Sequence, residues 1–315
     1  MIRKISLYLL LFLLLLGAIA SGLYLYTDKY LKNTITTPKL LFIPKGSTKS
    51  IIKMFKKEGI DLHWFDYYLI KMKGYPQAGW INLGEESLSR DAFFEKITHA
   101  KAALQNVTLI PGETNVLFLE ALAKQLDLNV SKLRKSYKEF SPYDDGVIFA
   151  ETYSVPLGID EHELMHYLVD QSLKEHQKLS YKYLNSYHDK AWFTDIVTKA
   201  SIIQKEAANV DEMPIVSAVI RNRLQKNMKL QMDGTLNYGK FSHIRVSAKK
   251  IRKDKSKFNT YMYAGLPPYP VCAVSKEAIM AALNPANVSY LYFVKGKNGK
   301  HIFTKSYKEH LKNIK

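Results

Sequence analysis

One carboxylic acid, Glu206, stands at the border of an apolar helical stripe. Ile196, Ala200, Ile203 and Ala207 recur at steps of four, three and four, and this spacing predicts one face of a helix. A carboxyl at the edge of such a face loses hydration in its charged form, so we expect a raised pKa. A raised pKa suits a general acid that works near neutral pH. From this helix alone, an inert surface glutamate paired with Arg or Lys is the simpler interpretation.

Polar side chains gather in the segments that follow Glu206, and they favour the chemical interpretation. A second predicted helix begins at Met213-Pro214, a Gly-containing turn follows it, and a rigid Gly265-Leu266-Pro267-Pro268 segment closes the region. Amides and tyrosines can hydrogen-bond sugar hydroxyls and stack on pyranose faces, although turn chemistry and buried hydrogen bonding account for them equally well. With Glu206 as the acid, this is the set that a sugar-cleaving site needs. The candidate substrate-binding residues are Asn222, Gln231, Asp233, Tyr238, Asn259 and Tyr261.

A short motif at His162-Glu163-Leu164-Met165-His166 offers an alternative, a zinc peptidase. H-E-x-x-H places two imidazoles one helical turn apart to hold Zn²⁺, with the Glu as general base. The Gly-x-x-His continuation is absent, and no acid lies between His176 and Asp189 to serve as a third ligand. Asp160 and Glu163 are also typical of a capping box at a helix start. Our main interpretation therefore includes no metal and no cofactor.

The apolar run from Ile5 to Tyr26 contains no charged residue and follows Arg3 and Lys4. A helix of this length is about 33 Å long, enough to cross a bilayer. We predict an uncleaved single-pass membrane anchor, with residues 1–4 in the cytoplasm and the remaining chain outside. A cleaved signal peptide is the alternative, because Ala18-Ile19-Ala20 fits a cleavage site.

The rest of the 315-residue chain, 47% hydrophobic and 24% charged overall, has the composition of a globular protein. Its single Cys272 excludes an internal disulfide. We predict a polar tether over residues 27–38, a small α+β module over 39–106 and a mixed α/β domain over 107–315, so the fold class is α+β. The elements expected from periodicity are strands near 40–44, 79–83, 107–110 and 146–153 and helices over 48–58, 90–100, 116–126, 131–138, 160–179 and 191–209.

The formal net charge of +17 is concentrated in part at Lys249–Lys257, KKIRKDKSK. Such a run could bind anionic lipid head groups or the carboxylates of a cell-wall polymer. Alternatively, it could be a solvated loop that keeps the protein soluble. Nucleic acid is not expected as a partner, because the chain is exported.

Over nearly everything after the anchor, the chain resembles the YceG-like endolytic murein transglycosylases (the MltG family). Gln204 stands where this family often has a first Glu, so Glu206 is the sole candidate acid of the motif. Gly234 stands where a Pro is common. The matching residues include Ala200-Ser201-Ile202-Ile203, Lys205-Glu206, Asn222-Arg223-Leu224, Leu230-Gln231, Asp233, Thr235, Asn259-Thr260-Tyr261, Gly265-Leu266-Pro267-Pro268, Tyr290-Leu291-Tyr292-Phe293-Val294, His301, Phe303 and Glu309-His310.

The resemblance implies a lyase with a LysM-like module at 39–106 ahead of a catalytic domain at 107–315. Such enzymes cut nascent peptidoglycan strands between N-acetylmuramic acid and N-acetylglucosamine, leave 1,6-anhydro ends, terminate strand elongation and work beside penicillin-binding proteins. The family's catalytic glutamate maps onto Glu206, and Gln231, Asp233, Asn259 and Tyr261 would position the saccharide. A non-catalytic cell-wall scaffold of the synthesis machinery is the alternative from a different class.

Overall fold

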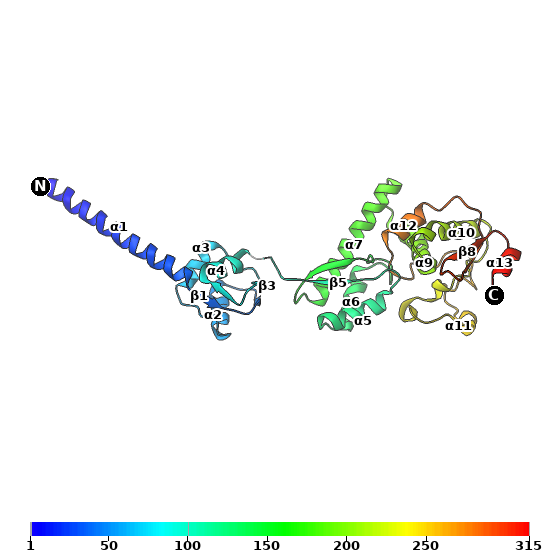
Figure 1. Ribbon diagram of the computed structural model, residues 1–315, viewed down its shortest axis with the longest axis horizontal. Helices are drawn as coiled ribbons and strands as arrows, with labels where there is room; N and C mark the ends of the chain where they lie inside the picture. Colours follow the sequence, from blue (N-terminus) through cyan, green and yellow to red (C-terminus); the bar gives the residue numbers. More distant parts are fainter. Residues whose placement is uncertain (1, 100, 315) are drawn as a thin grey trace. The chain divides into compact units, whose positions relative to one another are not determined.

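The computed structural model describes residues 2–99 and 101–314, with side chains from Leu10 onward, and these form two compact units (Figure 1). Unit 1 runs to Gln105 and includes Pro156–Gly158, and unit 2 contains Asn106–Val155 and the chain from Ile159. The break at Gln105 lies one residue from the boundary expected after residue 106. Helices mix with short two-stranded sheets, as the α+β class predicts.

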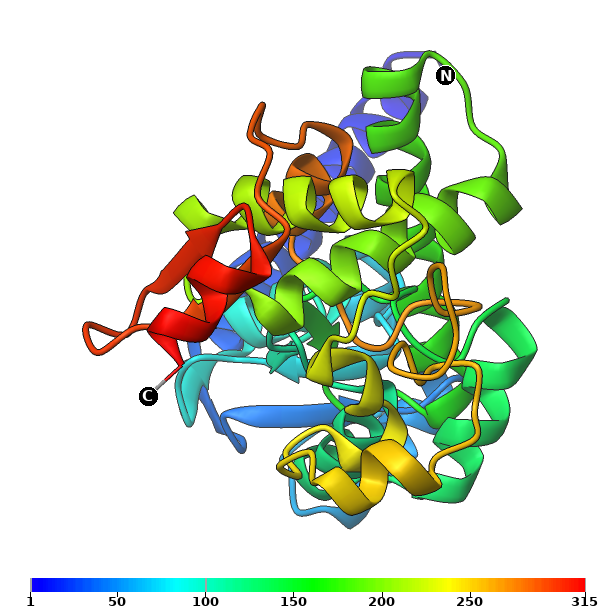
Figure 2. The same cartoon turned by 90° about the vertical axis from the view of Figure 1, so that its right-hand side faces the viewer.

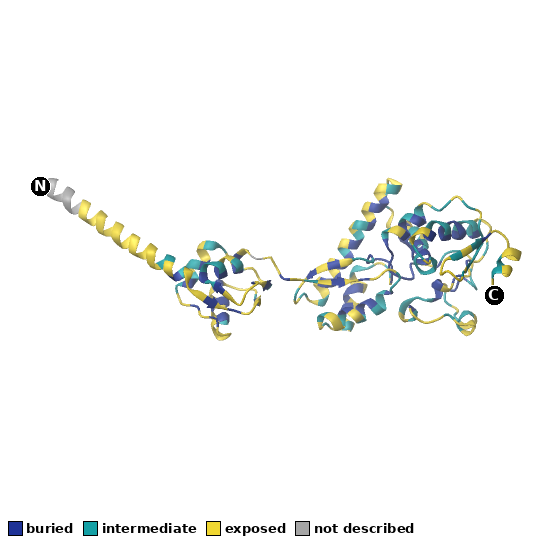
Figure 3. Cartoon of the chain, in the orientation of Figure 1, coloured by how far each residue is buried: buried dark blue, intermediate teal, exposed yellow. Residues whose placement is uncertain are grey.

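Helix α1 (Ile2–Lys32) carries exposed apolar side chains from Leu10 to Tyr26, and its ribbon is coloured as exposed over this stretch in Figure 3. The stretch Leu10–Lys32 is long and apolar enough to cross a membrane, a test that a signal sequence near the N-terminus also passes. Twenty-three residues at 1.5 Å each span about 35 Å. Length and composition are therefore compatible with a membrane anchor.

The prediction of a tether over 27–38 is wrong. Thr27–Lys32 continues α1, and β1 (Thr34–Thr36) pairs antiparallel with β4 (Ser87–Ser89). Tyr30 donates a hydrogen bond to the buried carboxylate of Asp66 (2.9 Å), and Arg90 donates to the same carboxylate (3.1 Å). These partners are at least 36 residues away in sequence, so local composition alone could not indicate that the segment packs.

Unit 1 is a small α+β module around one apolar core. Phe55, Ile70, Phe93 and Ile97 are fully buried in it. The helix predicted over 90–100 occurs at Arg90–His99, and residue 100 lies outside the described residues. The remaining elements are the antiparallel pair β2 (Leu40–Ile43) and β3 (Gly79–Asn82) with helices α2 (Thr48–Lys57), α3 (Asp66–Lys73) and α4 (Arg90–His99).

Unit 2 is mainly helical, with a central helix α9 (Thr198–Glu206) whose Ala200, Ile202 and Ile203 are fully buried. It follows a π-helical segment η1 (Trp192–Val197) and packs against α10 (Met213–Gln225) and α12 (Lys276–Leu283). The other elements are β5 (Leu104–Thr108), α5 (Asn115–Leu126), α6 (Val130–Phe140), β6 (Thr152–Pro156), α7 (Glu161–Leu184), α8 (Asp189–Ala191), η2 (Val210–Glu212), η3 (Asp233–Leu236), η4 (Gly239–Phe241), α11 (Ala248–Lys253), β7 (Tyr292–Lys295), β8 (His301–Thr304) and α13 (Tyr307–Asn313).

A buried histidine ties the start of the central helical segment to α7. Trp192 Nε1 donates to His176 Nδ1 (3.0 Å), and His176 Nε2 lies 3.0 Å from the carbonyl of Val147. Burial lowers the pKa of His176 to about 3, so the ring is neutral and can accept on one nitrogen while it donates from the other. These two hydrogen bonds of His176 fix the position of the segment that leads into α9.

The antiparallel hairpin β7–β8 and α13 lie next to α10 in both Figure 1 and Figure 2. The Arg223 side chain on α10 donates to the carbonyl of Leu291, just before β7 (2.7 Å). The C-terminal hairpin is thereby held beside the end of α10 and near the residues that follow α9.

Candidate active site

Glu206 is the last residue of α9, where the buried face of the helix meets solvent. Ala207 leaves the helix in an extended conformation, and Glu206 itself is half-buried. Of the predicted apolar stripe, Ala200 and Ile203 are fully buried, whereas Ile196 and Ala207 are only partly buried. The helix therefore presents a carboxyl at its end, backed by the core.

The Glu206 carboxyl accepts one backbone hydrogen bond, from the N–H of Gly234 to Oε1 (2.7 Å). A Cβ at residue 234 would lie 2.8 Å from this oxygen and 2.6 Å from Lys205 Cβ, so only glycine lets the turn approach so closely. Loss of hydration raises the pKa of Glu206 to about 7, and the Gly234 N–H and Arg223 oppose this rise. The raised pKa agrees with the sequence-based expectation.

A pocket of about 450 Å³ opens on this carboxyl. Its wall combines polar and charged side chains with aromatic rings, a combination suited to a saccharide, which has polar rims and apolar faces. The lining residues are Glu206, Arg223, Gln231, Met232, Asp233, Tyr261, Tyr292, Phe293, Val294, Tyr307, His310 and Ile314.

Two chain segments are joined beside Glu206. The Tyr261 hydroxyl donates to Asp233 Oδ1 (2.7 Å), and the Gln231 N–H donates to the carbonyl of Thr260 (3.1 Å). Gln231 takes a left-handed conformation at φ 48°, which turns the chain into the pocket wall. Burial, and then the neighbouring Asp233, raise the pKa of Tyr261, so its phenol stays protonated and donates.

Arg223 is the principal functional candidate that our site prediction omitted. Its Nε donates to the carbonyl of Leu291 (2.7 Å), its Nη1 bonds the carbonyl of Leu230, and the guanidinium lies 5.4 Å from the centre of the Tyr292 ring. These contacts fix a positive charge in the pocket near Glu206. The signal available in sequence was an arginine in the Asn222-Arg223-Leu224 match, but a helical pattern does not say that this side chain enters the pocket.

The fold and the site can now be compared with known proteins. A model of the family described as YceG-like matches residues 41–315. The chain belongs to the YceG-like family. The resemblance inferred from the sequence is thus confirmed.

Relatives of this YceG-like chain are named endolytic murein transglycosylases. The protein of Bacillus subtilis (strain 168) is 30% identical over 337 residues, which cover 93% of this chain and 89% of the relative. The protein of Streptococcus pneumoniae (strain ATCC BAA-255 / R6) is 27% identical over 73% of this chain but only 39% of its own length. A 2.6 Å crystal structure of a YceG-like protein from Listeria monocytogenes aligns with a TM-score of 0.57 and 22% identity, over 90% of this chain and 99% of that one, and supports the fold.

Of the predicted site residues, Gln231, Asp233 and Tyr261 lie in the Glu206 pocket, whereas three others do not. Asn259 is fully buried, and its amide donates to the carbonyls of Ile251 and Asp254 (2.8 and 2.7 Å). Tyr238 stacks on Phe258 and donates to Asp254 (3.0 Å). Asn222 holds the chain before β7. The side chains of Asn222, Tyr238 and Asn259 thus stabilise loops by hydrogen bonds. This is the alternative to sugar binding that the sequence left open.

The H-E-x-x-H motif lies on the first turns of α7, away from the pocket residues. The ring of His162 lies 3.4 Å from Glu139 and packs on Phe140, and His166 packs on the same ring. Asp160 caps the helix by accepting from the Glu163 N–H (2.8 Å), without the reciprocal half of the predicted capping box. Among residues 2–99 and 101–314, no group of three His, Cys, Asp or Glu side chains is arranged to hold a metal ion.

Proposed function

We propose that this YceG-like protein is a murein lytic transglycosylase that cuts within glycan strands, with Glu206 as its catalytic residue. The observation that supports this best is a glutamate with a pKa near 7 that is held by the Gly234 N–H and lines an aromatic and polar pocket. Relatives that carry the corresponding name support the reaction class. The bond cut is the one between N-acetylmuramic acid and N-acetylglucosamine.

Glu206 acts first as an acid and then as a base. With a pKa near 7, a large fraction is protonated at neutral pH and can donate to the glycosidic oxygen as the bond breaks. The resulting carboxylate then takes the proton of the muramoyl C6 hydroxyl, whose oxygen attacks C1 and closes the 1,6-anhydro ring. One carboxyl is enough, because the sugar supplies its own nucleophile.

Asp233, Tyr261 and Gln231 bind the saccharide and stabilise the positive charge of the oxocarbenium-like state. The hydrogen bond from Tyr261 orients the Asp233 carboxylate, which remains available to face a developing cation. Arg223 favours the ionised form of Glu206 after proton donation.

Asp233 also supports a second candidate reaction, hydrolysis. Two carboxyl groups in one pocket are what glycoside hydrolases use, with the second one activating a water molecule or attacking the sugar. The two reactions leave different ends, 1,6-anhydro or reducing muramic acid, so product analysis separates them.

The test is digestion of purified sacculi with the full-length protein in detergent, followed by mass spectrometry of the new ends. Wild-type protein should release anhydro-muropeptides, and Glu206→Gln should release none while still binding sacculi. Asp211→Asn, an exposed acid close by, serves as the matched control and should behave as wild type. Normal products from Glu206→Gln would reject the assignment, and reducing ends from wild type would favour hydrolysis.

The cellular setting is part of the same proposal. Helix α1 anchors the protein in the bacterial inner membrane, with the chain after this helix outside the cytoplasm. The module that follows α1 is LysM-like and binds glycan. Penicillin-binding proteins that make the strand are the proposed partners, and cleavage ends strand elongation. Binding without cleavage by wild-type protein would instead favour the scaffold alternative.

A further inference from the structure

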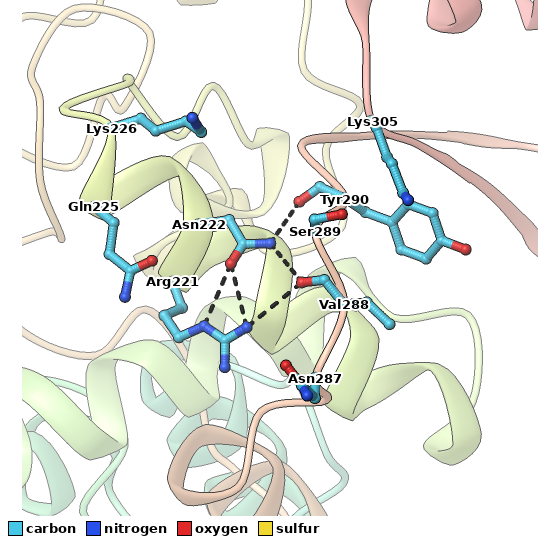
Figure 4. A pocket seen from close by; sticks show the side chains of 9 residues that line it. All are labelled: Arg221, Asn222, Gln225, Lys226, Asn287, Val288, Ser289, Tyr290 and Lys305. Carbon is cyan, nitrogen blue, oxygen red and sulfur yellow. Dashed lines mark hydrogen bonds between the residues drawn. The ribbon is translucent and has the colours of Figure 1, made fainter.

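A second pocket, of about 610 Å³, lies at the C-terminal end of α10 (Figure 4). Its wall is rich in basic and amide side chains and contains no carboxylate. The pocket is open to solvent. The lining residues are Arg221, Asn222, Gln225, Lys226, Asn287, Val288, Ser289, Tyr290 and Lys305.

The three cations of this pocket have no acidic partner among the described residues: none of Arg221, Lys226 and Lys305 lies within 4.0 Å of a described carboxylate oxygen. Some other basic side chains of unit 2 are paired, for example Lys250 with Asp254 (3.3 Å) and Lys199 with Asp195 (3.4 Å). An unneutralised group of three cations around one hollow attracts anions.

Arg221 is held in place by neutral groups, which leave its charge available. Its Nε and Nη2 donate to Asn222 Oδ1 (3.3 and 3.2 Å), and Nη2 also reaches the carbonyl of Ala286 (3.2 Å). The Asn222 amide in turn donates to the carbonyls of Val288 and Tyr290 (2.8 and 2.9 Å). In Figure 4 no dashed line ends on the third nitrogen of the Arg221 guanidinium. A fixed guanidinium with free donors is well suited to bind an oxyanion.

The basic pocket and the Glu206 pocket share two chain segments. On α10, Arg221 lines the first and Arg223 the second, and two residues apart on a helix means nearly opposite faces. On the C-terminal segment, Tyr290 lines the first and Tyr292 the second. The two pockets are thus separated by roughly the thickness of one helix, about 10–12 Å. An extended peptide of four or five residues covers about 13–17 Å, so it can reach from one to the other.

We propose that the basic pocket is an anion-binding subsite for the carboxylates of the peptide stem carried by a muramic acid bound at Glu206. This inference rests on the proposed function. The sugar occupies the Glu206 pocket, the stem passes the end of α10, and its carboxylates meet Lys226, Lys305 and the free donors of Arg221. The subsite makes stem-bearing strands better substrates than bare glycan.

The experiment compares full-length wild type with Lys226→Gln/Lys305→Gln on two substrates, intact strands and strands freed of stems by an amidase. Both lysines are exposed, so the double variant should fold normally. On intact strands its KM should rise about 2- to 10-fold with kcat unchanged, the size expected for losing exposed charge pairs. On stem-free strands it should match wild type. Lys249→Gln/Lys253→Gln removes the same charge from exposed positions of α11 and should have no such selective effect.

Each outcome decides a separate point. If wild type cuts neither substrate, the proposed function fails. If wild type cuts both and the two double variants change KM equally, or not at all, the subsite is rejected while the proposed function stands. If the KM effect of the pocket variant appears only on sacculi that retain phosphate-containing wall polymers, the anion is a phosphate and the stem assignment is rejected.

Discussion

Two glutamates six residues apart, Glu206 and Glu212, occupy contrasting environments in the same region of unit 2. Glu206 accepts one hydrogen bond, from the Gly234 N–H, and its pKa is raised to about 7 by loss of hydration. Glu212 is buried but accepts from the His301 N–H and ring and from the Ala208 N–H, and these bonds hold its pKa below the usual range against the effect of burial.

The difference shows that loss of hydration and local hydrogen-bond partners together, not residue type, decide what a carboxyl can do. Glu212 joins the turn between α9 and α10 to β8 and is stabilised as an anion, so it is suited to structure. Glu206 has little to stabilise its charge and is suited to proton transfer.

The largest effect is expected on turnover. Glu206→Gln should lower kcat/KM on sacculi by about 10²- to 10⁴-fold, the usual contribution of a general acid or base. Glu212→Gln should change it less than threefold when both proteins are assayed at a temperature where they are folded. Similar losses from both substitutions would remove the functional half of the contrast.

On stability the order reverses. Glu212→Gln should lower the free energy of unfolding by about 1–3 kcal/mol, because charge-assisted bonds to the His301 main chain and ring are weakened. Urea unfolding followed by circular dichroism measures this. Asp211→Asn, the exposed neighbour, should stay within about 0.5 kcal/mol of wild type and controls for loss of charge in the same turn.

Gly234 offers a test of the single bond that Glu206 does accept. Proline has no N–H, whereas alanine keeps it, and both add a Cβ to the same crowded spot. Because the N–H favours the charged carboxylate, Gly234→Pro should move the alkaline limb of the pH–kcat/KM profile up by up to about one pH unit relative to Gly234→Ala. Wild type should show that limb near pH 7. Equal shifts in both variants would mean that the Cβ alone perturbs the site.

The smallest effect is a pH dependence of melting temperature. The pKa of Glu206 is higher in the folded state than its ordinary 4.5, so ionisation destabilises the fold as pH rises from about 4.5 through 7. The melting temperature of Glu206→Gln should therefore exceed that of wild type at pH 8, by a few degrees, and match it at pH 4. For Glu212 the folded pKa is lowered, so its contribution is present above about pH 4.5 and lost below it. Glu212→Gln should melt below wild type at pH 8 and approach it at pH 4.

Periodicity located most of the helices, because apolar spacing is a local property. Helices predicted over 48–58, 116–126 and 131–138 occur at Thr48–Lys57, Asn115–Leu126 and Val130–Phe140. The strand expected at 146–153 occurs later, at Thr152–Pro156, because its pairing with β5 is a long-range event. The prediction of a tether was wrong for the same reason, because Tyr30 hydrogen-bonds to Asp66 in α3, far away in the sequence.

The sequence by itself determined the family. It also predicted Glu206 as the acid and a raised pKa for it, because a glutamate at the end of an apolar stripe loses hydration where the helix packs. The tertiary structure decided which polar residues accompany it. It brought Gln231, Asp233, Tyr261 and the unpredicted Arg223 to the pocket and assigned Asn222, Tyr238 and Asn259 to supporting loops. An amide or hydroxyl residue looks the same in the sequence whether its side chain binds a sugar or a backbone carbonyl. Only contacts between segments that are distant in the sequence distinguish these two roles.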